Sequence, residues 1–386
     1  MTRRWRAAAA LAVAALAVAI TAAGCGSASS QPGPASSPGP APLSVATAET
    51  GPGATWAAIP MGAASGADLF WQLFTRPAGA SRWSLETPPD IATNGALILA
   101  GQAGQGLITG ERPSLSLTFS AITATRDGGR TWATLPPTSG LANVPDALAV
   151  APDGHLIALG ANNVVSVAGP GAGWSTLTTG HALAATPAGR TCVLTGLTAV
   201  AYTPAGAPLV AGTCGHAGTA GVLTSAGGSW HLAGPALPAS LAGAPVRILR
   251  LTRTTSGDVA LLEAGTGAAA ALLAAWTGDG GQHWSVSPAL TLGGGHAVSA
   301  SFGQTGATAV VLSGNRGETL AGPGASWRAL PALPPGRTVT LALPAAGTTS
   351  ALAANGSTLT AWQLSPGASK WAKTQVITVP IQYGSS

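Results

Sequence analysis

Charged side chains are scarce in this chain, making up 8% of its 386 residues. The only two lysines, Lys370 and Lys373, lie close to the C-terminal end. A protein that binds nucleic acid needs a cluster of basic side chains to neutralise the phosphates. Because the sequence has no such cluster, we expect no nucleic acid among its partners.

Residue patterns that carry catalysis or bind metals are also lacking. The six histidines are scattered and never form the HxH or HExxH spacing of a metal site. No GxSxG motif frames a serine, and the twelve carboxylates are too dispersed for a calcium cluster. We therefore predict no catalytic residue, no metal ligand and no cofactor. We expect five of the aspartates to lie in turns: Asp68, Asp90, Asp146, Asp153 and Asp258.

The N-terminal end, by contrast, has the pattern of an export signal. Three arginines in MTRRWR precede an uncharged, Ala-rich run that ends just before Cys25. A basic start, a short apolar stretch and small residues before a cleavage point define a secretory signal. Residues 22–25, AAGC, resemble the lipobox of bacterial lipoproteins, in which the cysteine becomes the acylated first residue. Ala22 departs from that pattern, because a large aliphatic residue is usual there.

This resemblance implies that residues 1–24 are a signal peptide and that Cys25 carries a lipid. The alternative is ordinary secretion, with Cys25 as an incidental thiol. Without the three leader arginines, 14 basic and 12 acidic residues remain, a formal charge of +2. Arg3-Arg4 leaves a twin-arginine export route open beside the general one.

The segment after Cys25 is rich in Gly, Ser and Pro. Residues 25–53 contain almost no bulky apolar side chains and cannot bury enough surface to offset chain entropy. We expect them to be a flexible tether between the lipid and a domain formed by residues 54–386. The protein would then be a monomer, anchored by its N-terminal lipid to the outer face of the cytoplasmic membrane in the cell envelope.

Tryptophan marks an internal repeat in that domain. Seven tryptophans follow a Gly- or Ala-rich turn and precede a short alternating stretch, with spacings of 42 to 56 residues. They are Trp83, Trp132, Trp174, Trp230, Trp284, Trp327 and Trp371. Propeller blades of four strands repeat at about 40–50 residues. The repeat therefore predicts one blade for each tryptophan.

The stretches between the tryptophans predict β-hairpins. Residues 146–160, 197–212, 248–265 and 297–314 each contain two apolar runs joined by a Gly-containing turn. A third run leads to the Trp turn, and the tryptophan opens a fourth. We predict an all-β fold, a seven-bladed β-propeller, with six or eight blades as the alternatives.

Ring closure requires one composite blade in this prediction. Six complete units run from Trp83 to Trp371, so the seventh must use both ends of the domain. We expect residues 54–83, including a strand over 67–76, to be joined by the C-terminal run 374–382. Sharing a blade in this way would remove the open sheet edges that template aggregation.

Two of the Trp turns carry a more detailed motif. These are TRDGGRTW at 125–132, here the first box turn, and TGDGGQHW at 277–284, the second box turn. They resemble the Asp-box (BNR) repeats of sialidase-like propellers and their non-catalytic relatives, Ser/Thr-x-Asp-x-Gly-x-Thr-Trp, with His283 in place of the second threonine. The matching positions are Thr125, Asp127, Gly129, Thr131 and Trp132 in the first box turn, and Thr277, Asp279, Gly281 and Trp284 in the second.

The chemistry of these residues indicates a structural role. The aspartate accepts hydrogen bonds from backbone N–H groups of its own turn, and the glycine supplies a positive φ. The tryptophan is expected to pack its ring beneath the turn, between strands. The box positions are therefore predicted to brace the outer part of two blades.

The catalytic machinery of sialidases is not evident. Those enzymes need an arginine cluster, a tyrosine paired with a glutamate, and an aspartate. The Phe/Tyr-Arg-Ile-Pro motif is missing, and the only tyrosines are Tyr202 and Tyr383. Arg247, Arg250 and Glu263 are the candidates for a polar group facing the central channel, and a surface salt bridge is the other interpretation.

Two functions remain open from the sequence. The first is a non-catalytic binding or scaffold module for a protein, peptide or glycan. The alternative is a sialidase-like glycan hydrolase, or another propeller hydrolase or lyase with a degenerate site. A fold alone does not decide function. Polar residues where the innermost strands begin would favour the enzyme, and Ala, Gly and Leu there would favour the binding module.

The two remaining cysteines predict a disulfide. Cys192 precedes the apolar run 197–202, which leads through a Pro-Ala-Gly turn to the run 208–213 and Cys214. An antiparallel hairpin would bring both cysteines to its open end. An exported protein folds in a compartment where disulfides persist. Two buried free thiols are the alternative, and the segment before the hairpin, 181–191, is expected to be a loop.

Overall fold

The computed structural model describes most of the chain from residue 47 to residue 380. The described residues are 47–51, 54–62, 70–88, 91–102, 105–111, 121–136, 140–141, 144–160, 162–215, 218–343 and 348–380. All of them belong to one compact unit, Gly39–Ser386. The predicted signal peptide, Cys25 and most of the predicted tether lie outside them, as do Asp68, Asp90 and Tyr383.

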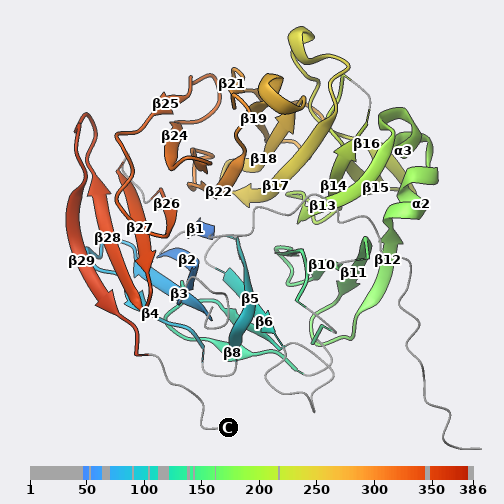
Figure 1. Cartoon of the computed structure of the whole chain (residues 1–386). Coiled ribbons are helices and arrows are strands. Elements are labelled where there is room, and N and C mark those ends of the chain that lie inside the picture. The colour runs from blue at the N-terminus through green and yellow to red at the C-terminus, as the bar shows by residue number, and fades with distance from the viewer. Residues whose placement is uncertain are drawn as a thin grey trace, which may run out of the picture. The chain divides into compact units, whose positions relative to one another are not determined.

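The described strands form four-stranded antiparallel meanders that succeed one another along the chain (Figure 1). The first two contain β1 (Thr47–Gly51), β2 (Ala54–Met61), β3 (Phe70–Pro77) and β4 (Ser84–Leu85), then β5 (Ala92–Gln102), β6 (Gln105–Glu111), β7 (Ile122–Thr125) and β8 (Ala133–Thr134). The next two contain β9 (Ala147–Val150), β10 (Leu156–Gly160), β11 (Val164–Ala168) and β12 (Ser175–Thr179), then β13 (Leu194–Tyr202), β14 (Pro208–Cys214), β15 (Val222–Ala226) and β16 (Ser229–Leu232).

The C-terminal half continues the pattern. One meander contains β17 (Val246–Thr254), β18 (Gly257–Ala264), β19 (Ala271–Thr277) and β20 (Ser285–Val286), with β21 (Leu290–Thr291) also paired to β19. The last two contain β22 (Ala297–Phe302), β23 (Thr308–Leu312), β24 (Arg316–Leu320) and β25 (Arg328–Ala329), then β26 (Thr338–Ala342), β27 (Thr349–Asn355), β28 (Thr358–Leu364) and β29 (Ala372–Thr378). The fold is a β-propeller, as predicted.

The predicted hairpins are confirmed by the strand pairing. β9 pairs with β10, β13 with β14, β17 with β18 and β22 with β23, all antiparallel. Each repeat tryptophan also lies at or just before the last strand of its meander, as the repeat predicts. These features were predictable because tight Gly-containing turns and alternating apolar residues are local signals.

The number of blades stays a prediction. β14 pairs with β17 of the next meander, so two meanders share one sheet. β1 pairs with β2 and also, in parallel, with Ser301 and Phe302 of β22. β1 also lies within the segment that was expected to be tether, so the sheet begins before residue 54.

The predicted composite blade is wrong. The C-terminal strand β29 pairs with β28 and completes the meander of β26 to β28, while β1 supplies the first strand of the N-terminal meander. The two meanders still meet through side chains. The amide of Gln375 accepts a hydrogen bond from the Trp83 N–H at 2.8 Å and donates one to the Trp83 carbonyl at 2.9 Å. These two hydrogen bonds join the first and last meanders in place of the shared strand that the sequence predicted.

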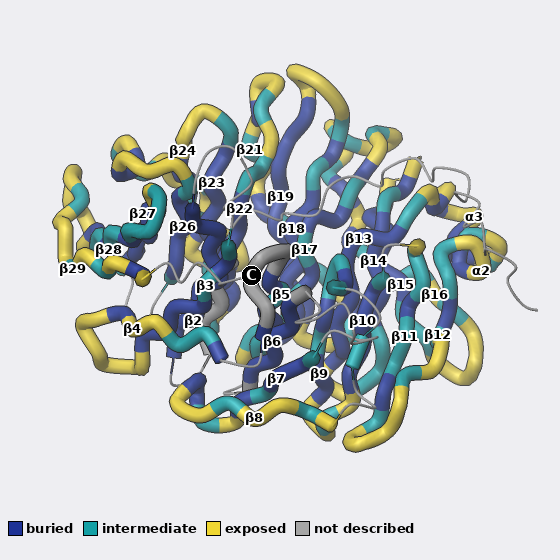
Figure 2. Tube along the Cα trace, turned by 60° about the horizontal axis from the view of Figure 1, so that its bottom comes forward, coloured by how far each residue is buried: buried dark blue, intermediate teal, exposed yellow. Residues whose placement is uncertain are grey.

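The hydrophobic core lies mainly between successive meanders. Each hydrophobic cluster of the described residues combines side chains from two neighbouring meanders and includes one repeat tryptophan. Trp83, for example, joins the cluster that contains Ile59 and Phe74 of the first meander and Leu352 of the last. Figure 2 shows buried residues along the strands and exposed residues in the connecting turns.

The segment expected to be a loop before β13 forms two short helices instead. They are α2 (Gly180–Ala185) and α3 (Pro187–Cys192). The hydroxyl of Thr179 accepts a hydrogen bond from the Ala182 N–H at 3.1 Å, and that of Thr186 accepts one from the Gly189 N–H at 3.0 Å. Such caps stabilise helix starts. Within the described part of the chain, no helix is long and apolar enough to span a membrane.

A disulfide joins Cys192 at the end of α3 to Cys214 at the end of β14, with the Cα atoms 5.0 Å apart. Both cysteines are buried. The bond therefore attaches the helical insertion to the open end of the β13–β14 hairpin.

Replacing both cysteines by serine is expected to lower the free energy of unfolding by about 3 kcal/mol, because the bond closes a loop of 22 residues in the unfolded chain. Urea unfolding of oxidised protein, reduced protein and the double variant measures this. The reduced protein and the variant should unfold at similar urea concentrations. Equal stability of all three would show that the bond does not restrain the chain.

Candidate functional site

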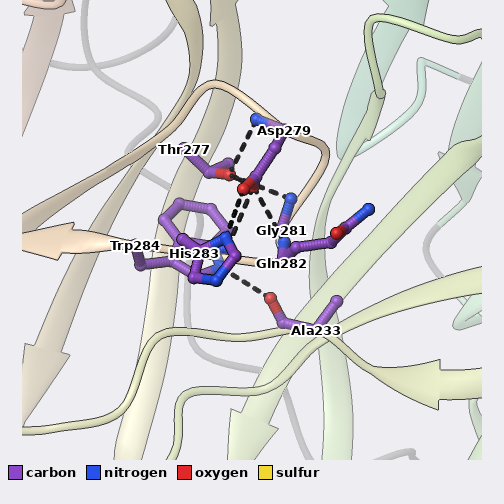
Figure 3. A network of polar contacts seen from close by, with 7 residues as sticks. All are labelled: Ala233, Thr277, Asp279, Gly281, Gln282, His283 and Trp284. Atoms are coloured by element: carbon purple, nitrogen blue, oxygen red, sulfur yellow. Dashed lines mark hydrogen bonds and ion pairs between the residues drawn. The ribbon is translucent and has the colours of Figure 1, made fainter.

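The two box turns share one hydrogen-bond pattern. In the first, Asp127 Oδ1 accepts from the N–H groups of Arg130 and Thr131 at 3.0 and 2.9 Å. In the second, Asp279 Oδ1 accepts from Gln282 and His283 at the same distances. Thr125 and Thr277 each donate their hydroxyl proton to the aspartate at 2.8 Å. Both turns are thus braced from within, as their residue types predicted; Figure 3 shows the second box turn.

His283 replaces the second threonine of the motif without loss of a contact. The hydroxyl of Thr131 donates to Asp127 Oδ2 at 2.7 Å. In the second box turn, the Nδ1 atom of His283 lies 2.6 Å from Asp279 Oδ2. The imidazole therefore occupies the position of the threonine hydroxyl, which explains why the motif tolerates this exchange.

These contacts favour the ionised form of both aspartates. The hydroxyl of Thr131 and then its N–H hold the pKa of Asp127 well below its usual value. For Asp279, the N–H and then the ring of His283 do the same. Carboxylates that accept several hydrogen bonds stay ionised at low pH. Asp279 is 39% exposed, so its negative charge reaches the surface beside the second box turn.

The box tryptophans pack their rings into the core between meanders. Trp284 joins the core between its own meander and the preceding one, and its Nε1–H donates to the Ala233 carbonyl at 2.6 Å (Figure 3). Trp132 likewise packs against side chains of the first meander. A large ring can bury its apolar surface at the interface between two meanders, because a single sheet has no interior of its own.

A pocket of about 620 Å³ adjoins the second box turn. Its walls are formed by residues 256–258 at the β17–β18 turn, by 276–279 and 283–285 around the box turn, and by Thr305 and Pro323 of the next meander. The pocket therefore lies where two meanders meet. Its size is typical of ligand-binding pockets.

Asp258 is the unexpected member of this pocket. It lies in β18 and not in a turn, is 0% exposed, and, among the described residues, neither of its carboxyl oxygens has a hydrogen-bond partner. Burial raises its pKa to about 7, against the opposing effect of Arg253. Buried carboxylates without partners are costly and tend to occur at functional positions. We therefore centre the candidate site on this pocket.

The first box turn has a different environment at the matching positions. Strand register places Asp258 opposite Thr277, and Gly106 opposite Thr125. A Cβ atom on Gly106 would lie 2.9 Å from the Trp56 ring, because that ring already fills the space. The residue before the box threonine also differs, Trp276 in the second box turn and Ala124 in the first. At the matching position the first box turn therefore has the Trp56 ring, whereas the second has the acid Asp258.

The candidate channel residues are brought together only in part. Arg247 donates a hydrogen bond to Glu263 at 3.1 Å, in an ion pair that is partly exposed. Arg250 lies opposite Leu261 in the same pair of strands, after a register shift. The ion pair fits the salt-bridge interpretation, since exposed pairs of this kind are common and contribute little.

The other sequence candidates for chemistry are not clustered. Within the described ranges, no group of three or more His, Cys, Asp or Glu side chains could hold a metal ion. Tyr202 is buried, its hydroxyl donates to the Leu156 carbonyl at 3.1 Å, and burial raises its pKa to about 12. Such a tyrosine is poorly suited to act as a nucleophile. Asp153 does lie in a turn, as expected, and Asp146 lies just before β9.

Comparisons with known proteins give structural neighbours at low similarity. No family model and no curated protein sequence matches the chain. Among solved structures, YCF48 from Cyanidioschyzon merolae is 15% identical, with 87% of this chain and 95% of that chain covered and a TM-score of 0.45. YCF48 bound to D1 peptide is 17% identical, with 79% and 99% covered and a TM-score of 0.36. A candidate 6-phosphogluconolactonase from Bacteroides fragilis is 11% identical, with 83% and 94% covered and a TM-score of 0.47. These values are too low to assign a family or a ligand, so the propeller fold rests on the strand pairing described above.

Proposed function

We propose that this chain is an exported, lipid-anchored β-propeller of the Asp-box type that acts as a non-catalytic binding module. The observation that carries the binding role is the pocket beside the second box turn, with its two indoles and its buried carboxyl group. Proteins, peptides and glycans are the ligand classes that we propose for this pocket. Membrane attachment, monomeric state and the outer-face location are parts of the same proposal.

The strand starts near the centre of the ring also support a binding module over an enzyme. In Figure 1 the first strands of the meanders, such as β5, β17 and β22, lie nearest the centre. The first residues of β1, β5, β9, β13, β17, β22 and β26 are Thr47, Ala92, Ala147, Leu194, Val246, Ala297 and Thr338. None of these first residues is acidic or basic, and Arg247, the second residue of β17, is already paired with Glu263.

Screening the full-length protein in detergent micelles on peptide and glycan arrays tests the binding role. A matched variant, Ser256→Trp, places an indole at the pocket wall, at an exposed turn position. We expect ligands that bind the wild-type protein to be lost from this variant, because the added ring fills the pocket. Absence of any binder, or binders that Ser256→Trp does not affect, would refute the role of this pocket.

Membrane attachment is tested at Cys25. We expect the wild-type protein to enter the detergent phase on phase separation, because an acyl chain adds favourable transfer free energy for each buried methylene. Cys25→Ala should leave the protein unprocessed or release it into the medium. A soluble wild-type protein that begins at a residue other than Cys25 would contradict the lipid anchor.

A further inference from the structure

We propose that the pocket beside the second box turn binds a cationic side chain, the lysine or arginine of a peptide. This inference rests on the proposed function and names the class of ligand for the same pocket. It follows from three features of the pocket: its negative charge, the hydrogen bonds that its two carboxyl groups make or lack, and the surfaces of its two indole rings.

The charge of the two box turns is opposite, although their folds are the same. The first box turn carries Arg126 and Arg130 beside Asp127. The matching positions of the second are Gly278 and Gln282, beside Asp279. None of the described residues that line the pocket is a lysine or arginine, whereas two of them, Asp258 and Asp279, are acidic. The pocket therefore attracts positive charge.

The two carboxyl groups act differently. Asp279 already accepts hydrogen bonds on both oxygens, so it contributes mainly its charge. Asp258 has no hydrogen-bond partner among the described residues, and its strand neighbour Arg253 donates to the Tyr202 carbonyl at 3.2 Å. Both carboxyl oxygens of Asp258 are fully buried in the pocket wall, so a donor reaches them only if the β17–β18 turn moves as the ligand enters. A buried acceptor without a donor gains most from a ligand that supplies one. An ammonium or guanidinium group carries both the donor and the charge.

The two indoles differ in exposure: Trp284 is partly exposed, whereas Trp276 is buried and meets the pocket only with the edge of its side chain that lines it. The Nε1–H of Trp276 donates to the Gly306 carbonyl at 2.7 Å, and that of Trp284 donates to Ala233. With both N–H groups occupied, the rings have only their apolar and π surfaces left for a ligand. Cations bind favourably against indole rings, and more strongly where the contact is shielded from water. Aromatic rings and carboxylates together select a cation over a neutral side chain.

The test uses immobilised peptides with random flanking residues and a fixed central residue, either arginine, lysine, citrulline or acetyl-lysine. The full-length protein in micelles is expected to bind the arginine and lysine peptides about ten-fold more tightly than their neutral counterparts. Asp258→Asn should reduce this preference. Equal binding of charged and neutral peptides would overturn the proposal.

A charge exchange between the box turns supplies the matched variants. Gly278→Arg with Gln282→Arg gives the second box turn the charges of the first, and should weaken binding of the arginine peptide about ten-fold. The fold should tolerate it, because a Cβ atom at Gly278 has its nearest neighbour 3.8 Å away and Gln282 is exposed. The reverse exchange, Arg126→Gly with Arg130→Gln, should leave binding unchanged. If the first exchange has no effect, the cationic ligand is refuted.

The outcomes separate this inference from the proposed function. Binding of neutral peptides or glycans that Ser256→Trp abolishes would refute the cationic ligand and leave the binding module intact. Absence of any ligand for the pocket would refute both. If the pocket bound free polyamines but no peptide, the peptide ligand would be refuted, and the preference of the pocket for cations would stand.

Discussion

Trp83→Ala is expected to lower the free energy of unfolding by about 3–5 kcal/mol, the usual loss for removing a buried large aromatic side chain. Trp83 is 3% exposed and lies in the core between the first and last meanders. The Arg76 guanidinium lies 5.2 Å from the centre of its ring, and Gln375 bonds both polar groups of its backbone. The substitution therefore weakens the contact that joins the two ends of the domain.

Urea unfolding of the full-length protein measures this effect. Trp327→Ala is the matched control, because Trp327 occupies the equivalent turn in another meander but is partly exposed and donates to Pro288. We expect a smaller loss for the control than for Trp83→Ala. If both variants lost the same amount of stability, the contact between the first and last meanders would contribute no more than the contact at Trp327.

Asp258→Asn is expected to stabilise the protein at pH 8 by at most about 4 kcal/mol, since one unit of pKa shift corresponds to about 1.4 kcal/mol and the buried amide offsets part of the gain. The folded pKa of Asp258 is raised from 3.8 to about 7 by burial. The ionised group therefore destabilises the folded state, and this cost grows as the pH rises from about 4 to about 7. Asparagine removes the charge and loses no hydrogen bond, because no described residue donates one to Asp258. The gain should shrink towards pH 4.

Thermal unfolding between pH 4 and pH 8 provides the measurement. Asp153→Asn is the control, because Asp153 lies in an exposed turn and its pKa is lowered, first by the N–H of His155. Its ionised form stabilises the folded state, so this variant should be less stable than the wild type at pH 8. If Asp258→Asn were less stable than the wild type at every pH, the ionised carboxyl group would stabilise the folded state, which would contradict its burial without a partner.

The sequence predicted those parts of the fold that depend on local chemistry. The hairpins over 146–160 and 248–265 and the position of each repeat tryptophan were predictable from turn residues and alternation. The internal bonds of the two box turns followed from the spacing of threonine, aspartate and glycine. Such signals act over a few residues, so a single sequence is enough to read them.

Contacts between distant segments were harder to predict. The partner of β29 was assigned wrongly, because an isolated apolar run near the C-terminus pairs equally well with several edges. The sequence also did not show that the tryptophan rings pack between neighbouring meanders. Residues 180–192 form two short helices whose caps, Thr179 and Thr186, are visible in the sequence but were outweighed by the all-β pattern.

Asp258 shows most clearly why the candidate site was missed. An aspartate after glycine suggests a turn, and Gly257-Asp258 was interpreted in this way. The acid nevertheless begins a run of buried residues, Val259 to Leu262. A charged residue directly preceding such a run was the available signal. The role of Asp258 depends on contacts with Trp276 and with residues of the next meander, and no local sequence pattern shows that these residues are close.

The most direct measurement of ligand binding at the second box turn is an NMR titration of the tryptophan indole groups. Full-length protein labelled with ¹⁵N-tryptophan, in micelles, is titrated with an arginine-containing peptide selected on the array. We predict that the indole N–H signals of Trp276 and Trp284 shift, while that of Trp132 at the first box turn does not. Shifts at Trp132 alone, or no shift at saturating peptide, would contradict the assignment of this pocket as the binding site.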